Sequence, residues 1–140
     1  MVHWIIPGEL ARAPRPGYRP GDETAVPLHA VEQWIERVKS SGIASIMCLI
    51  DDDQLPLYRS ALPHGLIEHY RARGFEVAHI PAYDGLTEPF TPDHYERAWR
   101  AYLALPKPVL VHCSAGFDRT GRIIEHILHR RNNGNGHHLV

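Results

Sequence analysis

The chain has 140 residues and a formal net charge of −1, with 15 Lys and Arg against 16 Asp and Glu. This length suits a single domain spanning residues 1–140, and the charge balance argues against a nucleic-acid-binding protein, which usually carries a basic excess. Two cysteines, Cys48 and Cys113, are too few for a disulfide framework, so a reducing, cytoplasmic location is expected. The first ten residues do not read as a signal peptide, and no apolar run is long enough to span a membrane.

The first half of the chain is predicted to contain one helix and one buried strand. Residues 1–27 are expected to form an irregular N-terminal segment, because residues 11–27 are rich in Pro, Gly and Arg. A helix follows and ends at Gly42, with apolar residues at i, i+3, i+4 and i+7: Val31, Trp34, Ile35 and Val38. The short apolar run 44–50 is typical of a buried strand that ends at a loop.

The second half alternates helices and strands. A short helix is predicted over 65–73, a strand over 75–80 and a loop over 81–89. Thr91 can cap the next helix, with Pro92 at its first position. One face of that helix is expected to hold Tyr95, Ala98, Trp99, Tyr102 and Leu103.

The chain then returns to the sheet and leaves it by a last helix. A third strand is predicted over 109–111, followed by a loop and a helix that carries Ile123, Ile124, Ile127 and Leu128. Residues 132–140 are expected to form a flexible tail. The alternation predicts an α/β fold with a central, largely parallel sheet flanked by helices, in which ligands bind at the carboxyl ends of the strands.

The stretch VLVHCSAGFDRTG, residues 109–121, places several rare residue types in a strand–loop–helix setting. A loop that opens a helix points backbone N–H groups inward and forms an anion site, and Gly116 permits a turn that a side chain would obstruct. These N–H groups and the helix dipole favour the nucleophilic thiolate form of Cys113. Arg119, five residues further on, offers a planar fork for two phosphate oxygens.

This loop resembles the signature of the protein tyrosine phosphatase superfamily, in which His-Cys precedes five residues, Arg, and then Ser or Thr. The resemblance implies a phosphatase-like fold of minimal size and a dual-specificity-like enzyme that needs no metal or cofactor. It also implies that Cys113 attacks phosphorus and that Arg119 holds the phosphate. His112 would order the loop, and Thr120 would donate a hydrogen bond to the Cys113 sulfur. The substrate would contact the residues between Cys113 and Thr120: Ser114, Ala115, Gly116, Phe117, Asp118 and Arg119.

A general acid must protonate the leaving oxygen. The family usually supplies an Asp from an upstream loop, and Asp84 matches best, although an Asp before Gly is also a common turn residue. Asp118 is a rival, because the GxDRTG ending resembles a bacterial branch and some phosphoinositide phosphatases that use a loop Asp. One of residues 51–53, all Asp, could also face the cleft, or all three could be solvated loop charges.

Several other residues carry open alternatives. Cys48 resembles the cysteine with which some superfamily members form a reversible disulfide to the nucleophile, and otherwise it is a buried strand residue. Arg12 and Arg15 could reach the cleft or be solvated loop charges. The histidines form no zinc pattern, and His126 is interpreted as a surface residue together with His129.

The sequence therefore predicts a phosphate monoester hydrolase that forms a cysteinyl-phosphate intermediate. Phosphotyrosine proteins are the expected substrates, with phosphoserine and phosphothreonine added if the cleft is shallow. A phosphoinositide or other small phosphorylated substrate is the alternative, although the loop lacks lysines. Alternatives of other classes are a non-catalytic phosphate-binding module and a sulfur-transfer enzyme.

Overall fold

The computed structural model describes residues 1–83, 90–116 and 118–139, with only the backbone described for 134–139. Its centre is a five-stranded sheet in the order β1-β2-β5-β3-β4. The strands are β1 (His3–Ile6), β2 (Leu10–Ala13), β3 (Ser45–Cys48), β4 (Glu76–His79) and β5 (Val109–His112). Only β1 runs antiparallel to its neighbour, so the predicted α/β class with a largely parallel sheet is confirmed.

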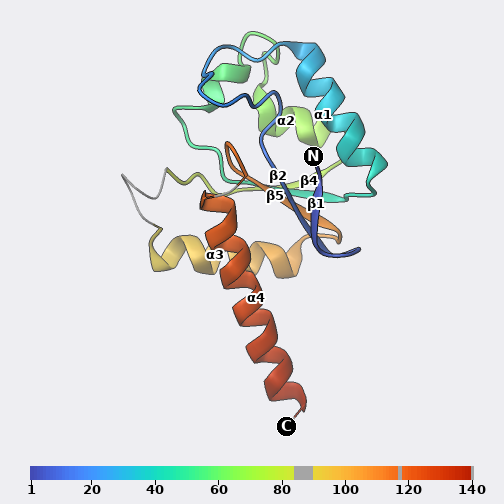
Figure 1. The fold of residues 1–140 in the computed structure, drawn as a ribbon, viewed down its shortest axis with the longest axis vertical. Coiled ribbons are helices and arrows are strands. Elements are labelled where there is room, and N and C mark those ends of the chain that lie inside the picture. Colours follow the sequence, from blue (N-terminus) through green and yellow to red (C-terminus); the bar gives the residue numbers. More distant parts are fainter. Residues whose placement is uncertain (84–89, 117, 140) are drawn as a thin grey trace.

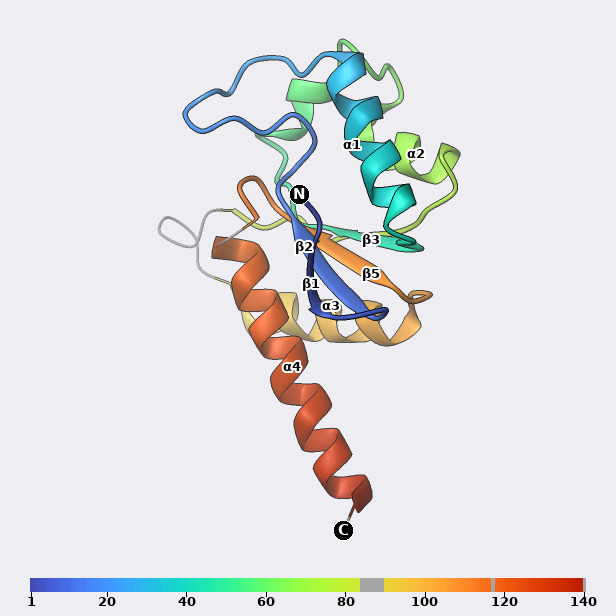
Figure 2. The same cartoon turned by 45° about the vertical axis from the view of Figure 1, so that its right-hand side comes forward.

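Helices cover both faces of this sheet, as Figures 1 and 2 show. On one face lie α1 (Leu28–Ser40), the short 3₁₀ helix η1 (Leu55–Tyr58) and α2 (Gly65–Ala72), and on the other lie α3 (Pro92–Ala104) and α4 (Asp118–Leu139). The helix predicted around residues 31–38 is confirmed as α1, and all four of its predicted apolar residues are buried. The Thr91 hydroxyl caps α3 by accepting from the His94 N–H, and Pro92 occupies its first turn, as predicted.

The two faces of the sheet carry separate cores because side chains alternate along each strand. Ile46 and Cys48 of β3 join the α1–α2 core, whereas Met47 lies in the core under α3 and α4. In β5, Leu110 faces α1 and α2, and its two valines face the other side.

Parts of the sequence-based description were wrong. Residues 1–27 are not all irregular, because the hairpin of β1 and β2 lies within them and β2 is the strand next to β5. Leu103 was predicted to share one face of α3 with the other apolar residues, but it is 60% exposed and does not lie on that face. The segment predicted as a tail, 132–140, continues α4 as far as Leu139.

Strand register brings three strand ends together. His112 of β5 pairs with Ala13 of β2 on one side and with Cys48 of β3 on the other. The residues that follow these three strands therefore meet at one edge of the sheet, next to the start of α4. Within the described residues, no helix is both long and apolar enough to cross a bilayer.

Candidate active site

The loop that links β5 to α4 is held against the backbone that follows β2. Gly116 has φ +85°, a conformation that L side chains rarely adopt. A Cβ at Gly116 would lie 2.8 Å from the carbonyl carbon and oxygen of Ala13 and 2.9 Å from the nitrogen of Pro14. Only glycine fits at this contact, which confirms the predicted need for a residue without a side chain.

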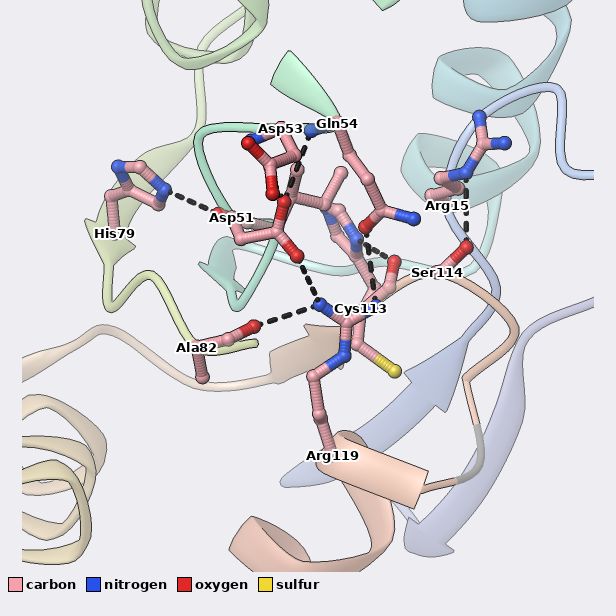
Figure 3. Close-up of polar contacts among 11 residues, drawn as sticks. Arg15, Asp51, Asp53, Gln54, His79, Ala82, Cys113, Ser114 and Arg119 are labelled. Carbon is pink, nitrogen blue, oxygen red and sulfur yellow. Dashed lines mark hydrogen bonds and ion pairs between the residues drawn. The ribbon is translucent and has the colours of Figure 1, made fainter. Parts of the chain in front are cut away.

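Cys113 opens this loop at the floor of a cleft with a volume of about 430 Å³. The thiol belongs to a side chain that is only 2% exposed, and it lies beside Arg119 in the close-up of Figure 3. The cleft walls come from the loop itself, from the segment after β3 and from the segment before α1: Tyr18, Arg19, Gly21, Asp22, Glu23, Asp51, Asp53, Gln54, Ser114, Ala115, Asp118 and Arg119.

Arg119 is held by three acceptors from two other segments (Figure 3). Its Nη1 donates to Asp51 Oδ2 over 3.1 Å and to the Ala82 carbonyl over 2.8 Å, and its Nη2 donates to Gln54 Oε1 over 3.2 Å. The Asp51 and Arg119 side chains are 8% and 6% exposed, so this is a buried ion pair. Of the three sequential aspartates, Asp51 is therefore a buried cleft residue, Asp53 lines the cleft but is exposed, and Asp52 is an exposed charge.

Asp51 also shapes the turn after β3. Its Oδ1 accepts hydrogen bonds from the backbone N–H groups of Asp53 at 2.9 Å and of Gln54 at 3.0 Å. One carboxylate thus fixes both the turn and the guanidinium of Arg119. The signal available in the sequence was an acidic run at the end of a buried strand, but the sequence did not indicate which member turns inward.

His112 is fully buried and orders the loop from below. Its Nδ1 donates to the Cys113 carbonyl over 3.0 Å, so Nε2 accepts from the Tyr70 hydroxyl over 2.9 Å. Burial is the main cause that lowers the pKa of His112 to about 4, partly opposed by the bond to Cys113. At neutral pH the ring is therefore uncharged, in agreement with an ordering role that needs no proton transfer.

Arg12 and Arg15, from the β2 side, reach the outer surface of the same loop. Arg12 donates through Nε to the Gly116 carbonyl over 2.9 Å and also through Nη2. Arg15 is only 2% exposed and donates through Nε to Ser114 Oγ over 3.2 Å. Neither arginine is a solvated loop charge.

The remaining predicted residues differ in what the structure says of them. Asp118 is the first residue of α4 and lines the cleft. Thr120 is fully buried, and its hydroxyl finds no hydrogen-bond partner in the described part of the chain, so its bond to the Cys113 sulfur stays a prediction. Asp84 and Phe117 lie outside the described residues.

Neither Cys48 nor His126 lines the cleft. Cys48 is a free, fully buried cysteine in the α1–α2 core, and burial raises the pKa of its thiol to about 12. His126 is not a simple surface residue, because its ring packs 4.8 Å from the Tyr95 ring and its Nε2 is buried without a hydrogen-bond partner among the described residues. Within residues 1–83, 90–116 and 118–133, no three His, Cys, Asp or Glu side chains are grouped to hold a metal ion.

Comparisons with known proteins agree with this geometry. Two solved structures share the fold at 22% sequence identity. One is kinase associated phosphatase carrying a catalytic-site Cys-to-Ser substitution, with a TM-score of 0.62 over 85% of this chain and 64% of that one. The other is the PTP-2 phosphatase of Cydia pomonella, with a TM-score of 0.58 over 94% of this chain and 71% of that one. The chain thus spans less than two thirds of the first of these proteins.

No curated protein sequence matches the chain. Residues 57–130, which include the whole loop from His112 to Thr120, match the model of the tyrosine phosphatase family. This match covers more than half of the residues of the chain. The chain therefore belongs to the tyrosine phosphatase family.

Proposed function

We propose that the chain is a catalytic domain, residues 1–140, that hydrolyses phosphate monoesters through a cysteinyl-phosphate intermediate. The observation that carries this proposal is the placement of Cys113 and Arg119 on one cleft, at the carboxyl end of β5 and the start of α4. A nucleophile and a two-pronged phosphate clamp in that arrangement suit in-line attack on a bound phosphoryl group.

In the first step, the Cys113 thiolate attacks phosphorus while the ester P–O bond breaks. A carboxylic acid donates its proton to the leaving oxygen, and Arg119 stabilises the charge on the equatorial oxygens. In the second step, water attacks phosphorus, the S–P bond breaks and the same carboxylate accepts the proton of the water. The products are an alcohol or phenol and inorganic phosphate, and the thiolate is regenerated.

Asp84 is the proposed acid, with Asp118 as its rival. Asp84 follows β4, beyond Ala82, whose carbonyl already contacts Arg119, and this sequence position supports its assignment. Asp118 lines the cleft, as the first residue of α4. Thr120 is proposed to assist departure of the Cys113 sulfur in the second step.

The proposed substrates are phosphotyrosine proteins, with phosphoserine and phosphothreonine proteins as further substrates. The charges of the cleft walls favour a substrate with a single phosphate group, because acidic side chains outnumber the arginines there. Asp22, Glu23 and Asp53 would repel a substrate that carries several phosphates. This charge balance weighs against the phosphoinositide alternative.

The test is turnover of a small aryl phosphate by four proteins: wild type, Cys113→Ser, Asp84→Asn and Asp118→Asn. The proposal predicts no detectable turnover in Cys113→Ser, and in Asp84→Asn a loss that is larger for substrates with poor leaving groups. Undiminished hydrolysis by Cys113→Ser would overturn the mechanism. A harmless Asp84→Asn beside a crippled Asp118→Asn would move the acid to the loop.

A further inference from the structure

Arg15 is a buried cation that touches the loop at Ser114 through two separate bonds. Its backbone N–H donates to the Ser114 carbonyl over 2.8 Å, and its Nε donates to Ser114 Oγ over 3.2 Å. Figure 3 shows the second bond on the side of the loop away from the Cys113 sulfur. The Arg15 side chain therefore fixes the residue that follows the nucleophile.

The rest of the guanidinium is anchored in two other segments. Nη1 donates to the Tyr58 hydroxyl over 3.1 Å, and Nη2 donates to the Asp22 carbonyl over 3.4 Å. The Tyr58 hydroxyl in turn donates to the Pro16 carbonyl over 2.6 Å. These anchors leave Arg15 little freedom, so the position of Ser114 depends on the packing of η1 and of the segment before α1.

The bond to the Ser114 carbonyl decides how the next peptide unit faces. In a planar trans peptide, the carbonyl and the following N–H point in opposite directions. The Arg15 backbone N–H, rather than its side chain, holds the Ser114 carbonyl and so turns the Ala115 N–H to the other side of the loop, and Ala115 is a cleft residue. The Cys113 carbonyl, held by His112, turns the Ser114 N–H in the same manner.

The charge of Arg15 forms no salt bridge in the described residues, although it acts at longer range on the Asp22 carboxylate. Its side-chain hydrogen bonds go to two hydroxyl groups and a carbonyl, and it forms no salt bridge among residues 1–83, 90–116 and 118–133. Burying an unpaired charge is costly, and the cost falls when an anion occupies a neighbouring site. The nearby cleft, where Ser114 lies beside Cys113, is such a site.

We propose that Arg15 is a positioning residue of the phosphate-binding loop, whose side chain holds Ser114 in place and whose buried charge favours a bound anion in the adjacent cleft. The inference rests on the proposed phosphate chemistry of Cys113. Arg15 follows β2 and lies outside the sequence motif of residues 112–120. The inference therefore makes the segment after β2 part of the phosphate-binding site.

The test measures binding of inorganic phosphate by titration calorimetry, which does not require turnover. The variants Arg15→Gln and Arg15→Lys remove the charge and the planar fork respectively, and Ser114→Ala removes only the side-chain acceptor. Two controls are matched: Arg37→Gln and Arg59→Gln each remove an exposed arginine that does not line the cleft.

We expect Arg15→Gln to raise the phosphate dissociation constant about tenfold, and Arg15→Lys and Ser114→Ala about threefold, as suits a charge-assisted bond and its geometry. Both controls should keep the wild-type dissociation constant within about twofold. A purely structural role would lower the melting temperature in the Arg15 variants and leave their dissociation constants at the control values. If Arg15→Gln does not fold, unchanged binding in Arg15→Lys and Ser114→Ala overturns the inference.

Aryl phosphate turnover in the same preparations separates this inference from the proposed function. If the wild type hydrolyses the aryl phosphate and all Arg15 variants bind phosphate as tightly as the controls do, the inference alone is overturned. Phosphate binding that depends on Arg15, without any wild-type turnover, would overturn the proposed enzyme activity and support the inference. A wild type that neither binds phosphate nor turns over aryl phosphate would overturn both.

Discussion

Asp51 and Arg119 form a buried ion pair across the cleft, with Oδ2 and Nη1 3.1 Å apart. The other oxygen of Asp51 closes the turn after β3, so the orientation of the proposed phosphate clamp depends on a residue 68 positions away in the sequence. Arg119 contacts Asp51, Ala82 and Gln54 through Nη1 and Nη2 alone. Its Nε makes no bond to any of these three residues.

Asp51→Asn tests this dependence. The amide keeps an oxygen for the turn but loses the charge, so a buried Arg119 is left unpaired and the free energy of unfolding should fall by about 3 kcal/mol. Misplacement of the clamp should lower kcat/KM for an aryl phosphate by about 10- to 100-fold. Urea unfolding and steady-state kinetics measure the two effects, and the exposed neighbour Asp52→Asn is the control. Equal kinetics in the two variants would contradict a positioning role for Asp51.

Gly116→Ala should abolish activity by disrupting the loop. The added Cβ would meet backbone atoms of Ala13 and Pro14 that cannot move aside, at a φ that already disfavours a side chain. We expect kcat/KM to fall by more than about 100-fold. Gly8→Ala is a matched control, because Gly8 also has a positive φ of +75° but open space around its Cβ position. It should cost about 1 kcal/mol of stability and leave kcat/KM unchanged.

His112 should make stability depend on pH in the acid range. Its pKa of about 4 lies below the ordinary value of 6.5, so the unfolded chain binds a proton that the folded chain does not between these two values. The contribution of the neutral His112 ring to the free energy of unfolding is fully present above pH 6.5 and is lost as the pH falls towards 4. It amounts to about 3 kcal/mol.

Urea unfolding at pH 7 and pH 4.5 measures this contribution in wild type and in His112→Gln, which cannot titrate. The variant should be less stable at pH 7, because the bonds to Tyr70 and Cys113 are altered, but it should lose less stability on acidification. An identical loss in both proteins would show that His112 is not held neutral.

Cys48 is expected not to form a disulfide with Cys113 under mild peroxide. The Cys48 side chain lies in the core beneath α1 and α2, whereas Cys113 lies in the core beneath α3 and α4. Burial also raises the pKa of the Cys48 thiol to about 12, which suppresses the thiolate needed for exchange. Peptide mass spectrometry under denaturing conditions should find oxidised Cys113 and unmodified Cys48. A Cys48–Cys113 linkage would contradict this prediction and support the redox role that the sequence left open.

The sequence predicted the four α-helices from their apolar periodicity and the strands β3, β4 and β5 from short apolar runs. It missed β1 and β2, because β2 overlaps the Pro- and Arg-rich stretch that begins at residue 11 and was read as irregular. The loop from His112 to Thr120 was identifiable because all of its chemistry is local in the sequence. The sequence left the roles of Asp51 and Arg15 open and did not indicate Gln54, because each support depends on strand register and on which way a turn faces.

Detection of phosphate on Cys113 during turnover tests the central claim most directly. Wild-type protein is mixed with an aryl phosphate, quenched in acid within the first turnovers and digested, and the peptide that contains Cys113 is analysed by mass spectrometry. The account predicts a phosphorylated cysteine at Cys113 in wild type, more of it in Asp84→Asn if that residue also assists hydrolysis of the intermediate, and none in Cys113→Ser. Steady hydrolysis without phosphate on Cys113, at an undiminished rate in Cys113→Ser, would contradict it.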